Sequence, residues 1–126
     1  MARKIIEASE AGARAMKTSV TIAVSDAGGH LVALARMDGA SFGSLTSAQR
    51  KAYTGAGLAM STAILEKAIV AVPALVSALG DGFTLLGGGL PIVKGGQLIG
   101  AIGIAGGSSE QDSQIAAAGL TALEQM

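Results

Sequence analysis

The chain has 126 residues, half of them hydrophobic, and its nine basic and nine acidic side chains cancel. Neutral charge and the presence of only two phenylalanines, one tyrosine and no tryptophan exclude the basic, aromatic surface of a typical nucleic-acid-binding protein. The absence of cysteine excludes disulfides, thiolate metal sites and cysteine nucleophiles.

The length suits one domain over residues 1–126, and 14% charged residues with no net charge favour self-association, so we expect a homo-oligomer. The sequence has no uninterrupted apolar stretch of 18 residues and no hydrophobic leader at its start, which predicts no membrane partner. We expect a cytoplasmic protein; secretion with a removed signal peptide stays open at this point.

The first half of the chain predicts a helix, a hairpin and a second helix. Residues 2–17 place charges around an apolar stripe at helical spacing. Two β-branched, alternating segments follow, 19–25 and 31–37, and the glycine-containing turn Asp26–His30 joins them as a hairpin. Alanines then recur every three or four residues from Leu45 to Ala63, which predicts a helix.

The second half begins with an apolar, helix-prone run, Ile64–Leu79, which Pro73 must start or break. Three short strands are predicted at 83–86, 89–93 and 97–104, followed by a last helix after Ser108. The expected order is α-β-β-α-α-β-β-β-α. Because the strands come in local hairpins, an α+β fold with an antiparallel sheet and helices on its faces is favoured over a parallel one.

The run Gly87-Gly-Gly-Leu-Pro91 has two interpretations. Glycines permit close approach of two backbones, and the proline marks an edge or a strand start. Alternatively, the bare backbone of Gly87, Gly88 and Gly89 forms one wall of a ligand pocket. Classical nucleotide loops are disfavoured, because no glycine-rich run has the required spacing or the phosphate-binding lysine.

Near the last helix, Ser108 and Gln111 have the spacing of a capping box, while Glu110 and Asp112 suit the positive end of the helix dipole. Helix capping alone accounts for these residue types, with no ligand-binding or catalytic site. The alternative is that Glu110 is an exposed carboxylate for a metal ion or a proton.

His30 is the only histidine, so neither a histidine cluster nor a second catalytic imidazole is available. A turn histidine is usually solvated, yet His30 is the one side chain able to give haem iron a strong nitrogen ligand. Arg50 and Lys51 lie on the second predicted helix. They form either a solvated face or a cationic pair that meets a carboxylate or a propionate.

Five ordered segments resemble the GlcG/HbpS family, the haem-degrading-domain group that includes the C-terminal domain of PduO-type proteins. These segments are Val24–Asp38, Lys51–Thr54, Gly87–Pro91, Gly100–Gly107 and Glu110–Asp112. The resemblance implies a profilin-like three-layer α/β/α fold with a five-stranded antiparallel sheet, and assembly into dimers up to octamers. It also implies haem binding or degradation for some members, while others belong to catabolic operons. The apolar run 65–81 departs from the Gly/Pro-rich loop usual in relatives.

The resemblance implies that a site is lined by matching positions, namely Asp26, His30, Lys51, Gly87, Gly88, Gly89, Pro91, Glu110 and Asp112. The leading hypothesis is a small oligomeric haem-binding protein; whether it also degrades haem is left open by the sequence. In it the Gly87–Pro91 wall holds the porphyrin, Arg50 or Lys51 meets a propionate, and His30 ligates the iron. One alternative is an enzyme or accessory protein for a small organic acid, using Lys51 and a carboxylate. Another is a purely structural oligomer whose glycines bring subunits together.

Overall fold

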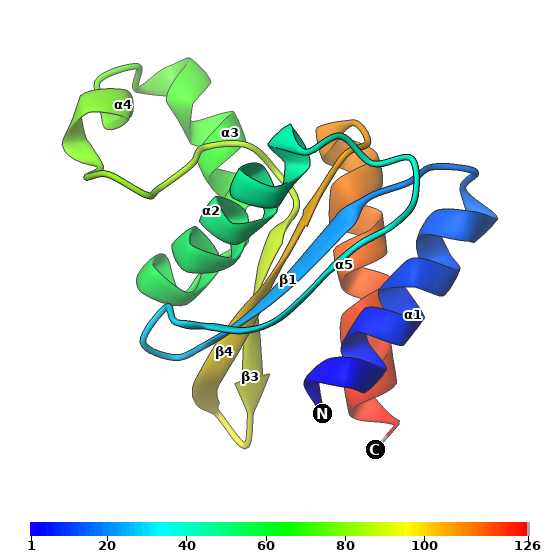
Figure 1. The fold of residues 1–126 in the computed structure, drawn as a ribbon. Coiled ribbons are helices and arrows are strands. Elements are labelled where there is room, and N and C mark those ends of the chain that lie inside the picture. Colours follow the sequence, from blue (N-terminus) through cyan, green and yellow to red (C-terminus); the bar gives the residue numbers. More distant parts are fainter. Residues whose placement is uncertain (126) are drawn as a thin grey trace.

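The computed structural model describes residues 1–125 and contains one four-stranded antiparallel sheet flanked by helices. In chain order the elements are α1 (Ala2–Ala15), β1 (Thr21–Asp26), β2 (Leu31–Arg36), α2 (Gly43–Leu58), α3 (Thr62–Ala71), α4 (Leu75–Ala78), β3 (Gly89–Lys94), β4 (Gln97–Ala105) and α5 (Ser109–Glu124). The strand order is β2-β1-β4-β3. Helices α1 and α5 cover one face of the sheet and α2 covers the other, which gives three layers (Figure 1).

The two faces of the sheet are packed differently. The face under α1 and α5 is aliphatic, with fully buried isoleucines from strands and helices, including Ile5, Ile22, Ile104 and Ile115. Burial of such side chains contributes about 1.5–3 kcal/mol each before the entropy of ordering is subtracted. This side therefore supplies most of the hydrophobic stabilisation.

The face under α2 is built from small residues, because the helix lies directly on the sheet. A Cβ added at Gly103 of β4 would collide with the carbonyl oxygen of Ala48 and would lie 2.5 Å from the backbone nitrogen of Ala52. The alanines whose spacing predicted this helix, Ala48, Ala52 and Ala56, are buried. The helix ends at Leu58, before the predicted end, because Ala59 adopts a left-handed conformation (φ 52°) and Ser61 caps α3.

The prediction of five strands is wrong: the described residues form four, and the order is α-β-β-α-α-α-β-β-α. Residues 83–86 cross the end of α2 and pair with no strand. The Thr84 N–H donates to the Thr54 hydroxyl at 2.9 Å, and the Phe83 ring packs edge-on against Tyr53 at 4.9 Å. The Thr54 side chain of α2 thus binds the Thr84 N–H, a group that a strand would offer to a neighbouring strand.

The apolar run that departs from the family pattern divides into α3 and the short α4, with Pro73 between them. This part of the chain extends away from the sheet (Figure 1). Many of its apolar side chains are exposed, among them Ile64, Val70, Val72 and Val76. None of the helices within residues 1–125 has the length and apolar character needed to cross a membrane.

Candidate functional site

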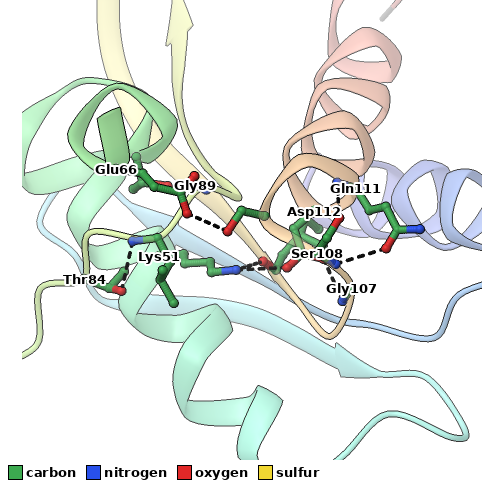
Figure 2. Close-up of polar contacts among 12 residues, drawn as sticks. Lys51, Glu66, Thr84, Gly89, Gly107, Ser108, Gln111 and Asp112 are labelled. Atoms are coloured by element: carbon green, nitrogen blue, oxygen red, sulfur yellow. Dashed lines mark hydrogen bonds and ion pairs between the residues drawn. The ribbon is translucent and has the colours of Figure 1, made fainter. Parts of the chain in front are cut away.

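A buried ion pair joins α2 to α5. The Lys51 ammonium lies 3.0 Å from Asp112 Oδ2 and donates a second hydrogen bond, 2.9 Å long, to the Ile104 carbonyl (Figure 2). The two side chains are only 4% and 2% exposed. Asp112 Oδ1 accepts the Gly107 N–H at 2.9 Å, so both carboxylate oxygens are satisfied. Charges buried this deeply are tolerated only when they are paired and hydrogen-bonded.

The glycine run lies against this pair. A Cβ on Gly88 would be 2.6 Å from the Ile104 carbonyl oxygen and 3.0 Å from Lys51 Cδ. A Cβ on Gly89 would collide with the Lys51 carbonyl, and one on Gly87 would lie 3.1 Å from the Ser113 hydroxyl. The space in front of these glycines is filled by the chain's own atoms. Within one chain they allow close backbone approach and leave no free wall.

The start of α5 is the predicted capping box. Ser108 Oγ accepts the Gln111 N–H, and the Gln111 side chain accepts the Ser108 N–H. Glu110 is exposed on the first turn, two positions before the buried Asp112. Among residues 1–125 no group of three or more histidine, aspartate or glutamate side chains is arranged to hold a metal ion.

The β1–β2 turn is a separate place that carries Asp26 and His30. Asp26 Oδ1 accepts the backbone N–H groups of Gly28 and His30, both at 2.9 Å, and lies 3.3 Å from His30 Nδ1. The hydrogen bond from the His30 backbone, followed by that from Gly28, holds the pKa of the Asp26 carboxyl below its ordinary value. The His30 side chain is 82% exposed.

An open pocket of about 310 Å³ lies between this turn and α2. Its lining consists of Ser25, Gly29, Leu31, Thr46, Gln49, Arg50, Ala52, Tyr53 and Gly82. The Tyr53 ring packs closely against two glycines: a Cβ on Gly29 would be 3.0 Å from it, and one on Gly82 would be 3.4 Å from it. The pocket thus has a cation, several neutral polar groups and an aromatic wall.

Most of the residues singled out in the sequence divide into two groups, while the exposed Glu110 belongs to neither. Lys51, Gly87–Gly89 and Asp112 form the buried cluster. Asp26 and His30 lie on the turn, which reaches the pocket at Gly29, and Arg50 lines the pocket itself. Pro91 lies on β3 opposite Ala101 and belongs to neither group.

Sequence reasoning missed four polar pocket residues: Ser25, Thr46, Gln49 and Tyr53. Tyr53, the only tyrosine, and Ser25 both fall within segments that resemble the family and could have been selected on that ground. Thr46 and Gln49 are ordinary polar residues whose position at the pocket depends on how α2 packs on β1.

The family model, the related sequences and the solved structures that match this chain all indicate the same family. The family described as "Haem degrading protein HbpS-like" matches residues 1–121. Protein GlcG of Escherichia coli K12 is 40% identical over 111 residues, which is 82% of this chain and 77% of that protein. A solved complex of PduOC with haem has a TM-score of 0.88 and 30% identity, covering 95% of this chain and 89% of that one. A double mutant of Streptomyces reticuli HbpS has a TM-score of 0.89 and 34% identity, covering 97% and 83%.

Proposed function

Since the chain belongs to the HbpS-like family, we propose that it binds haem and that His30 is the iron ligand. The solved complex of PduOC with haem supports haem binding, because PduOC has the same fold and is 30% identical to this chain. The observation that carries the proposal within the chain is the environment of His30, its only histidine.

His30 fits the role of a metal-binding imidazole. Its side chain is 82% exposed, and Nδ1 faces the Asp26 carboxylate at 3.3 Å. Histidines that ligate metals usually donate the N–H of the other ring nitrogen to a carboxylate or carbonyl, which fixes the tautomer and raises ligand basicity. Asp26 would play that part and keep Nε2 available for iron. Bound haem would supply the redox and oxygen chemistry that haem degradation requires.

Arg50 is the cation that would meet a propionate. Lys51, the other residue considered for this contact, is buried and already paired with Asp112 and the Ile104 carbonyl. Arg50 is exposed and lines the pocket beside the β1–β2 turn. Its planar guanidinium can bind a carboxylate through two hydrogen bonds.

A hemin titration followed by absorbance tests this function. We expect saturable binding with a Soret band that differs from that of free hemin, and loss of that band in His30→Ala. The matched control is Lys94→Ala, an exposed residue at the other hairpin turn, which should bind as the wild type does. If the titration of the wild-type protein gives only the spectrum of free hemin, haem binding is rejected. An unchanged band in His30→Ala would reject His30 as the ligand.

Loss of the Soret band on addition of ascorbate and oxygen would extend the proposal to haem degradation. Persistence of the band would limit it to binding.

Self-association is also part of this proposal. Exposed apolar side chains gather on α3, α4 and the segment after them, including Ile64, Val70, Val76 and Leu86. An exposed apolar patch usually marks an interaction site. Light scattering should give a mass above the 12.3 kDa of one chain, and a monomer at all concentrations would contradict it. The cytoplasmic location stays a prediction, to be tested by cell fractionation.

A further inference from the structure

We propose that the pocket between the β1–β2 turn and α2 also binds a ligand other than haem, and that the two ligands compete because both would use Arg50. The second ligand is a small carboxylic acid with a flat apolar body and a hydroxyl group at the far end. Arg50 would hold the carboxylate at the rim, and the Ser25 hydroxyl would pair with the ligand hydroxyl at the floor.

Ser25 is the observation that points to a ligand. The residue is only 4% exposed, and its hydroxyl has no hydrogen-bond partner within residues 1–125. Nearly all buried polar side-chain atoms in native proteins have a partner, because leaving one unpaired destabilises the fold. A polar group of a bound molecule would supply the missing hydrogen bond.

The direction of the Ser25 side chain follows from strand alternation. Its neighbour Val24 packs in the aliphatic core under α1 and α5, so Ser25 lies on the α2 face of β1. Ser25 also borders a smaller pocket of about 140 Å³ on the α1 side, which is lined mainly by aliphatic residues. The α2 face favours the larger, more polar pocket.

Arg50 gives the pocket its charge preference. No acidic side chain lines this pocket, and Arg50 has no carboxylate partner among the described residues. An unpaired guanidinium in a concave site with neutral polar neighbours favours an anion, and its fork geometry matches a carboxylate.

Tyr53 and Leu31 determine the body of the ligand. The Tyr53 ring packs against Gly29 and Gly82 and contacts Phe83 edge-on, so it forms an aromatic wall. Leu31 adds an apolar surface. Aromatic rings favour stacked or edge-on contacts with other rings, and a volume of about 310 Å³ is at the small end of ligand pockets. A single-ring acid therefore fits better than a larger molecule.

Isothermal titration calorimetry without hemin tests this site, with 4-hydroxybenzoate, 3-hydroxybenzoate, benzoate and phenol as probes. The wild type should bind at least one hydroxybenzoate about tenfold more tightly than it binds benzoate or phenol, as loss of one paired polar group predicts. Ser25→Ala should bind hydroxybenzoate no more tightly than benzoate. Arg50→Gln should bind hydroxybenzoate no more tightly than phenol. Arg3→Gln, a matched change on the exposed side of α1, should have no effect.

Thermal unfolding separates a ligand contact from a structural role of Ser25. Because Ser25→Ala removes an unpaired buried hydroxyl, its melting temperature should equal or exceed that of the wild type while its hydroxybenzoate affinity falls. The proposal would be overturned if the wild type showed no saturable hydroxybenzoate binding. It would also be overturned if Ser25→Ala and Arg50→Gln both bound hydroxybenzoate with the affinity of the wild type. The comparison of hydroxybenzoate with benzoate on the wild type needs no variant to fold. Failure of the hemin titration would leave this result standing, and the reverse also holds.

Discussion

Replacing Lys51 by methionine would separate the two charges that join α2 to α5. Methionine keeps most of the length of the lysine stem, so packing beside Gly88 is largely retained. Asp112 Oδ2 and the Ile104 carbonyl oxygen would both lose their partner in a region where Asp112 is only 2% exposed. Removing one member of a buried pair costs about 3–5 kcal/mol, a large share of the roughly 5–15 kcal/mol that holds a domain folded.

Urea unfolding followed by far-ultraviolet circular dichroism measures this cost. We expect the midpoint of Lys51→Met to fall with little change in slope, since the surface exposed on unfolding stays similar. Lys4→Met on the exposed side of α1 is the matched control, and a surface change of this kind should stay within about 0.5 kcal/mol.

The double variant Lys51→Met/Asp112→Leu removes both charges. It leaves two neutral groups unpaired, the Gly107 N–H and the Ile104 carbonyl, so we expect it to be more stable than either single variant. A cost below about 1 kcal/mol for Lys51→Met, or a double variant as unstable as the sum of the singles, would refute the reasoning.

Three further changes have defined outcomes. Gly88→Ala should cost more than about 2 kcal/mol in urea unfolding, because Gly88 has φ 127° and its Cβ would lie 2.6 Å from a carbonyl oxygen; a smaller loss would show that the loop relaxes. Ser108→Ala should cost about 1 kcal/mol through loss of the capping hydrogen bond, and an unchanged melting temperature would contradict this. The pKa of Asp26 should lie below 3.8 by NMR titration, since the His30 backbone N–H stabilises its carboxylate. Because the folded pKa is depressed, the stabilisation from Asp26 is complete above pH 3.8 and is lost as pH falls through the folded value; a titration at or above 3.8 would refute the turn geometry.

Features set by neighbouring residues were predictable. The two hairpins follow from alternating β-branched segments around glycine turns, and they appear as β1–β2 and β3–β4. The capping box at Ser108 needs only residues three apart, and the structure contains it. The cap joins residues three positions apart, and the hairpin strands pair across a tight turn with partners at most 15 positions apart, such as Thr21 with Arg36, so local spacing determines the outcome.

Features set by distant contacts were decided only by the tertiary structure. Lys51 and Asp112 are 61 positions apart, and only the packing of α2 and α5 brings them into contact. The strand predicted at 83–86 does not form, because Thr54, 30 positions away, binds its backbone. Ser25, Arg50 and Tyr53 line one pocket because α2 lies directly on a sheet face of small residues. Local pattern therefore determined most of the helices and strands of this protein, while packing decided whether residues 83–86 form a strand and which side chains meet.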